Sequence, residues 1–220
     1  MTSAPLSASL RASLERSTET YQSQLDDEAQ AYLAGRALGP HAIATHRLGV
    51  VRDPRPGDER FLGRLAIPYL GPKGNVYGTT YRCMGDHDCK ELEHPKYDRP
   101  AGIPGRMFNT VALTAPTDYI FVTEGEIDCM SITECGWPAV GMPGANGWRP
   151  HHARMLAGFS KVILLADPDE AGSKFASSFT RSLPQSGSVI LCQYKEARDV
   201  NDVLRLYGKD GLVELLKEEA

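Results

Sequence analysis

A short apolar run that ends in an acidic residue and a glycine constrains the fold of this chain most strongly. Residues 119–122 are β-branched and aromatic, which predicts a buried strand that brings Glu124 to its carboxyl end. Gly125 permits a tight turn, and a helix is expected over residues 126–135, with Asp128 in its first turn. In an open α/β sheet, ligands bind in the crevice beyond the strand ends. The pattern therefore predicts an α/β domain whose site includes these two acids.

Two later strands repeat this arrangement. The continuous apolar run over residues 161–166 is typical of a parallel strand covered on both faces, and it leads directly to Asp167 and Asp169. A third predicted strand, over residues 188–193, leads to Asp199. Carboxylates this close repel one another unless a cation lies between them, and Mg²⁺ is a usual cation for ligands that are all oxygen. The three strand ends together predict one metal site.

A Glu-Gly pair after one strand, an Asp-x-Asp after a later one and a further Asp past the next resemble the TOPRIM signature. Bacterial-type primases, topoisomerases, some nucleases and recombination adaptors share that domain. From about Ala31 onwards, the chain resembles the catalytic core of a bacterial-type (DnaG-like) primase, in a variant similar to those of actinobacteriophages. The resemblance implies an α/β TOPRIM domain, a mainly parallel sheet flanked by helices, over residues 116–220. A smaller basic α+β subdomain (29–115) and a helical or partly disordered N-terminal arm (1–28) would precede it.

The distribution of charge fits this division. The 220 residues carry a net charge of −4, but residues 29–115 hold 12 Lys/Arg against 8 Asp/Glu, whereas residues 116–220 hold 10 against 15. A basic half beside an acidic half suits a phosphate-binding wall facing a metal-binding wall. Within the basic half, an apolar run, a Gly/Pro-rich turn and a second run over residues 64–82 predict a β-hairpin.

The resemblance also implies roles for particular residues. Glu124 would be the general base for the primer 3′-hydroxyl or a metal ligand, and Asp128 would support the metal cluster. Mg²⁺ or Mn²⁺ would be held by Asp167, Asp169 and Asp199. The incoming nucleotide or the template would be contacted by four basic residues: Arg36, Arg82 at the end of the hairpin, Lys96 in a Pro-Lys-Tyr element, and Arg106.

The function implied is template-directed synthesis of short RNA primers on single-stranded DNA from ribonucleoside triphosphates. Two alternatives stay open: a TOPRIM nuclease, which shares the carboxylates, and a non-catalytic recombination or replication adaptor. A replicative helicase and a separate zinc-binding module are the expected protein partners. The sequence contains no apolar run of about 20 residues and no signal peptide, so we expect a cytoplasmic protein that does not enter the membrane.

One loop contains four residues that can bind zinc. Cys83, His87, Cys89 and His94 lie within twelve residues, and four nitrogen and sulfur ligands can hold a structural zinc ion. The usual pair of cysteines two to four residues apart is missing. The spacing therefore favours an ordinary polar loop, with zinc binding as the alternative.

Overall fold

A computed structural model describes residues 6–101, 105–144 and 147–217, and the chain divides into two compact units. Unit 1 comprises Met1–Ala34 and Gly39–Pro104, and unit 2 comprises Gly35–Leu38 and Gly105–Ala220. The sequence places the subdomain boundary later, at residues 115/116. It also groups the short segment Gly35–Leu38 with the first subdomain, whereas in the structure this segment lies with unit 2.

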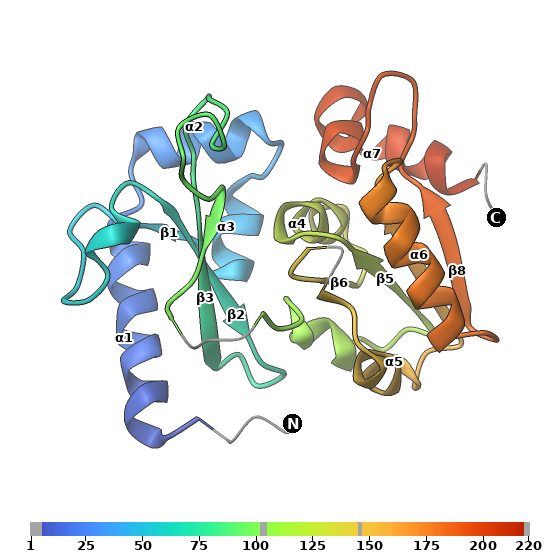
Figure 1. Cartoon of the computed structure of the whole chain (residues 1–220), viewed down its shortest axis with the longest axis horizontal. Coiled ribbons are helices and arrows are strands. Elements are labelled where there is room, and N and C mark those ends of the chain that lie inside the picture. Colours follow the sequence, from blue (N-terminus) through green and yellow to red (C-terminus); the bar gives the residue numbers. More distant parts are fainter. Residues whose placement is uncertain (1–5, 102–104, 145–146, 218–220) are drawn as a thin grey trace. The chain divides into compact units, whose positions relative to one another are not determined.

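Unit 1 combines helices with a small antiparallel sheet (Figure 1). The elements are α1 (Ala8–Ser23), α2 (Asp27–Gly35), α3 (Pro40–His46), β1 (Gly49–Val50), the 3-10 helix η1 (Glu59–Phe61), β2 (Leu65–Leu70), β3 (Val76–Arg82) and β4 (Tyr97–Asp98). The strands follow the order β1-β2-β3-β4. Strands β2 and β3 form the predicted hairpin, in which Leu65 pairs with Arg82. The α+β character predicted for this part of the chain is confirmed.

Helix α1 is built into unit 1 through an aromatic core. Tyr21 of α1 is buried in a cluster that also contains Phe61 and Tyr81, and the latter two rings stack with centroids 3.8 Å apart. Gly49 allows α1 to approach β1, because a Cβ atom at that position would lie 2.3 Å from the Tyr21 carbonyl carbon. The N-terminal segment is therefore an integral helix of unit 1 from residue 8 onwards, and residues 1–5 lie outside the described part.

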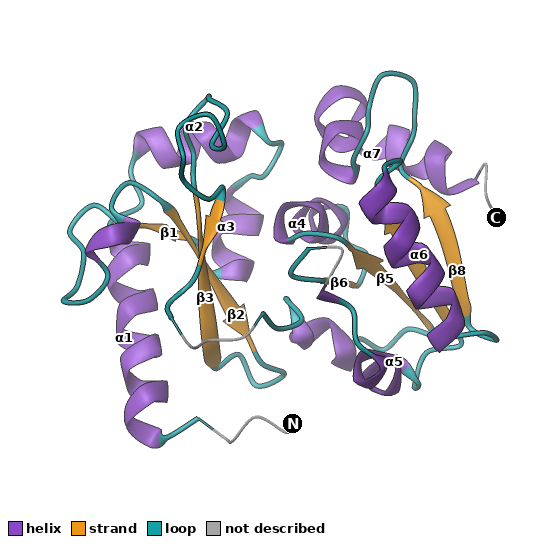
Figure 2. Cartoon of the chain, viewed as in Figure 1, coloured by secondary structure: helices purple, strands orange, loops and turns teal. Residues whose placement is uncertain are grey.

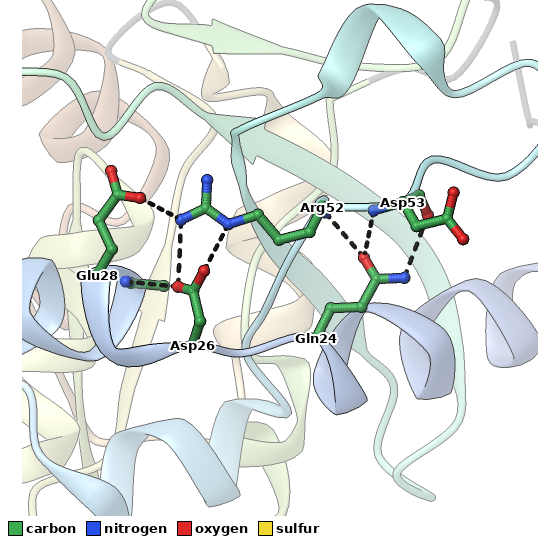
Figure 3. Close-up of polar contacts among 6 residues, drawn as sticks. Gln24, Asp26, Glu28, Arg52 and Asp53 are labelled. Atoms are coloured by element: carbon green, nitrogen blue, oxygen red, sulfur yellow. Dashed lines mark hydrogen bonds and ion pairs between the residues drawn. The ribbon is translucent and has the colours of Figure 1, made fainter.

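The connection between α1 and α2 is fixed by polar contacts to the segment after β1 (Figure 3). The Gln24 Oε1 atom accepts hydrogen bonds from the backbone N–H groups of Arg52 and Asp53, at 2.8 and 3.0 Å. The Arg52 guanidinium donates to Asp26 at 2.7 Å and to Glu28 at 2.6 Å. Because these ion pairs are largely exposed, we expect them to orient the connection more than to stabilise it.

Unit 2 is a parallel α/β domain (Figure 2). Its elements are the 3-10 helix η2 (Thr110–Thr114), β5 (Tyr119–Thr123), α4 (Glu126–Glu134), β6 (Ala139–Gly141), α5 (Pro150–Leu156), β7 (Lys161–Ala166), α6 (Glu170–Ser182), β8 (Gly187–Leu191) and α7 (Val200–Lys217). The four strands are all parallel and lie in the order β6-β5-β7-β8. This sheet, with helices between its strands, confirms the predicted α/β fold class.

Helices cover both faces of this sheet. Helix α4 packs against α7, and α5 packs against α6. The connection from β5 to β6 runs in one direction along the sheet and the connections through β7 to β8 run in the other, so right-handed crossovers place the two helix pairs on opposite faces. The core under α5 and α6 includes Val122, Leu164, Phe175 and Phe179. Among the described residues, no helix is both long and apolar enough to cross a bilayer.

Candidate active site

Glu124 and Asp167 meet at the point of the sheet where the direction of the strand connections reverses. Strands β5 and β7 are parallel neighbours, with Thr123 paired to Leu165, and the chain leaves them towards opposite edges of the sheet. Such a switch point is where open α/β sheets bind ligands. Glu124 follows β5, and its Oε1 atom accepts a hydrogen bond of 2.9 Å from the backbone N–H of Asp167, which follows β7. Two acids 43 residues apart are therefore joined directly.

The charges of the other four predicted acids all act on Asp167. The pKa of Asp167 is raised from 3.8 to about 8, first by burial and then by the charges of Asp128, Glu124, Asp199 and Asp169. Burial also raises the pKa of Glu124; the hydrogen bond from Asp167 opposes this rise and the Asp169 charge adds to it. Acids that follow three different strands therefore act on the same carboxylate, and their side chains are half-buried to exposed.

Backbone N–H groups at the starts of helices hold three of these carboxylates in place. Asp169 is the N-cap of α6 and accepts from the Gly172 N–H at 2.7 Å. Asp199 precedes α7 and accepts from the Asp202 N–H at 2.6 Å. The Asp128 carboxylate of α4 accepts from the Asn201 N–H at 3.1 Å, 73 residues away. The positive end of a helix favours carboxylates, so these contacts offset part of the repulsion within the cluster.

Gly172 and Asn201 complete this arrangement. A Cβ atom on Gly172 would lie 2.2 Å from the Asp167 carbonyl oxygen and 2.7 Å from Glu124 Oε1, so only glycine lets α6 start this close to the acids. Asn201 is 1% exposed, and its side-chain amide donates to the Arg36 carbonyl at 2.7 Å and to Ser131 Oγ at 3.0 Å. A glycine in the first turn of α6, where most residues form helix better, was the available signal for Gly172.

The four predicted basic residues are divided between the two units. In unit 2, Arg36 is half-buried and donates to Asn201 Oδ1 at 3.3 Å, beside the acids, and Arg106 is half-buried just before the bridge between Phe108 and β6. In unit 1, Lys96 is exposed, whereas Arg82 is buried. The Arg82 guanidinium donates to the hydroxyls of Tyr32 and Tyr97 and lies over the Tyr97 ring.

The donor set is suited to a hard divalent cation. Every side chain of the cluster offers carboxylate oxygen, which matches Mg²⁺ or Mn²⁺ and is a poor match for softer metals. A half-buried group of acids, one of which has a pKa near 8, gains most from a cation that offsets their mutual repulsion. The chemistry of these ligands therefore suits Mg²⁺ or Mn²⁺.

The Cys/His loop differs from the ordinary polar loop that its spacing favours. The ligand atoms of Cys83, His87, Cys89 and His94 all lie within 4.8 Å of one another. The loop begins at the end of β3 and leads to β4, so it lies in unit 1, separate from the acids of unit 2.

Comparison with known proteins agrees with this geometry. The Toprim-like family profile matches residues 121–204. The Gene 57 protein of Mycobacterium phage D29 is 39% identical over 158 residues, which are 70% of this chain and 98% of that protein. The DNA primase of Chlamydia pneumoniae is 30% identical over 167 residues, 72% of this chain but only 28% of that protein.

Solved structures show the same fold. The RNA polymerase domain of Mycobacterium tuberculosis primase DnaG, in complex with a double-stranded DNA oligomer with a 6-nucleotide overhang, superposes with a TM-score of 0.78. The two sequences are 22% identical, and the match covers 98% of this chain and 81% of that one. The parallel sheet and its cluster of acids define unit 2 as a TOPRIM domain. The chain belongs to the same family as the Gene 57 protein of Mycobacterium phage D29. It combines a Toprim-like domain with the fold of a DnaG-like primase core.

Proposed function

We propose that this chain is a DNA primase core that synthesises short RNA primers on single-stranded DNA by metal-dependent nucleotidyl transfer during phage DNA replication. The observation that supports this proposal most strongly is the cluster of five acids around the switch point of a TOPRIM sheet. The similarity to DNA primases supports it further. The match covers only 28% of the C. pneumoniae primase. We also propose that the chain acts with a replicative helicase and with a separate zinc-binding module.

In this proposal, Asp167, Asp169 and Asp199 hold Mg²⁺ or Mn²⁺, and Asp128 supports them. When bound, the ions would offset negative charge on the attacking and leaving oxygens of the phosphoryl group. Glu124 takes the proton of the primer 3′-hydroxyl or serves as a further ligand. The raised pKa of Glu124 suits a base, because proton transfer is most efficient when the pKa of the base approaches the working pH.

The basic residues would bind the phosphates of the nucleotide or the template. Lys96 is exposed, so it can reach a phosphate directly. The Arg82 side chain is buried between tyrosine hydroxyls, which favours Lys96 over Arg82 as the direct contact in unit 1. In unit 2, we assign phosphate binding to Arg36 and Arg106, which are both half-buried.

The test is an extension assay with single-stranded DNA, labelled ribonucleotides and Mg²⁺ or Mn²⁺. We expect short labelled RNA whose synthesis depends on the template, and its loss in Asp167→Asn but not in Asp53→Asn, a matched change at an exposed aspartate of unit 1. Degradation of the DNA would indicate the nuclease instead. Binding of DNA without either reaction, at all metal concentrations, would indicate the adaptor.

A further inference from the structure

We infer that unit 1 contains a structural zinc site formed by Cys83, His87, Cys89 and His94, which is independent of the proposed priming activity. The ligand atoms of the four side chains lie within 4.8 Å of one another. Two thiols and two imidazoles are the ligand set of many structural zinc sites, and this set discriminates against Mg²⁺ and Ca²⁺.

The distances between the ligand atoms are close to those of tetrahedral zinc. Zinc at about 2.3 Å from sulfur and about 2.05 Å from nitrogen sets a sulfur and a nitrogen about 3.6 Å apart, and two nitrogens about 3.4 Å apart. Cys83 Sγ lies 3.5 Å from His87 Nε2, and His87 Nε2 lies 2.9 Å from His94 Nε2. The sulfur atoms of Cys83 and Cys89 lie within 4.8 Å of each other. The two histidines need to separate by about half an ångström to match.

The surroundings of the two histidines orient them towards this centre. His94 Nδ1 lies 3.4 Å from the Pro95 carbonyl oxygen. A proton on Nδ1 that is donated to a backbone carbonyl leaves the Nε2 lone pair for a metal, as is usual for zinc-bound histidine. Gly85 provides room for the His87 ring, because a Cβ atom at that position would lie 2.2 Å from the ring carbon Cε1.

The position of the loop in the fold indicates that zinc would stabilise it. Residues 83–96 connect β3 to the two-residue strand β4 without a helix or strand of their own. Most of their side chains are exposed, and Cys89 is the buried exception. A loop that buries so little apolar surface has little hydrophobic stabilisation, and a metal ion can supply the missing constraint. Zinc would fix both ends of the loop, where the Cys83 N–H donates to the Lys96 carbonyl at 2.9 Å.

The experiment measures the metal content of the full chain, purified without a histidine tag and without chelator. Elemental mass spectrometry should find about one zinc ion per chain. In the double variant Cys83→Ser/His94→Asn, the zinc content per chain should fall by a factor of at least about ten, because half of the ligands are lost. The matched control is His151→Asn, an exposed histidine of unit 2, which should keep its zinc.

A second measurement does not depend on whether the variant folds. The wild-type chain is reconstituted with Co²⁺, and its visible spectrum should show the d–d bands of a tetrahedral ion together with sulfur-to-cobalt charge transfer. A wild-type chain that contains little zinc and gives an octahedral cobalt spectrum would overturn the inference. So would a disulfide between Cys83 and Cys89 in the protein prepared under reducing conditions, or a double variant that binds zinc as the wild type does.

Discussion

Replacing Asp167 with asparagine should stabilise unit 2 at alkaline pH when Mg²⁺ and Mn²⁺ are absent. The pKa of Asp167 is about 8 in the folded protein, against 3.8 for the ordinary side chain, because of burial and the four neighbouring acids. Between these two values the folded state holds a proton that the unfolded state releases. Stability is therefore lost as the pH rises from about 4 to about 8, and it changes no further above that range. The asparagine side chain has no charge to gain, so the variant should lack this part of the pH dependence.

The size of the effect follows from the pKa shift. At about 1.4 kcal/mol for each pKa unit, the difference between 3.8 and about 8 sets a ceiling of about 6 kcal/mol. Asp167 is only half-buried, and solvent screens the repulsion from its neighbours. We therefore expect the free energy of unfolding of Asp167→Asn to exceed that of the wild type by about 1–3 kcal/mol at pH 8.5, with no difference at pH 4.

Urea denaturation followed by tryptophan fluorescence is a suitable assay, since Trp137 and Trp148 both lie in unit 2. The buffers contain no chelator, so that metal bound by the Cys/His loop is undisturbed. Added Mg²⁺ should stabilise the wild type at pH 8.5 and should stabilise Asp167→Asn less. Equal stability of the two proteins at pH 8.5, or an equal gain in the control Asp53→Asn, would refute the convergence of the acids as its cause.

Three further substitutions test close contacts within the two units. Gly172→Ala places a Cβ atom 2.2 Å from the Asp167 carbonyl, and urea titration should show a loss of about 1–3 kcal/mol. Asn201→Ala removes a buried amide with two acceptors, and thermal unfolding should show a loss of about 1–3 kcal/mol, with the less buried Asp202→Asn as the comparison. Gly49→Ala should separate α1 from β1 by displacing Tyr21, with faster amide hydrogen exchange in α1 and little change in unit 2.

The sequence was sufficient to predict the parallel sheet and the acids because both depend on local patterns. Apolar runs predicted strands at 119–122 and 161–166, and the structure has them at Tyr119–Thr123 and Lys161–Ala166. Acids that follow neighbouring parallel strands must lie at the same end of the sheet, beyond the carboxyl ends of the strands. Helix α7 is interrupted at Gly208, where φ is 66°.

Local patterns do not predict contacts between residues that are far apart in the sequence. The Cys/His spacing resembled no common zinc motif, and only the hairpin and β4 bring the two ends of that loop together. The burial of Arg82 depends on Tyr32, 50 residues earlier, and nothing near Arg82 in the sequence indicates that contact. The role of Asn201 depends likewise on Arg36 and Ser131, 165 and 70 residues away.

The starts of the helices explain how unit 2 can carry its acids before a cation binds. Asp169 and Asp199 each accept an N–H from the first turn of the helix that follows, and Asp128 accepts one from the first turn of α7. Each such contact favours the charged carboxylate by about 0.3–1 kcal/mol. Burial and the charges of the four neighbouring acids raise the pKa of Asp167 to about 8. Asp167 is therefore the acid that holds a proton at neutral pH. Binding of a divalent cation should release that proton without moving the acids that accept hydrogen bonds from the helix starts.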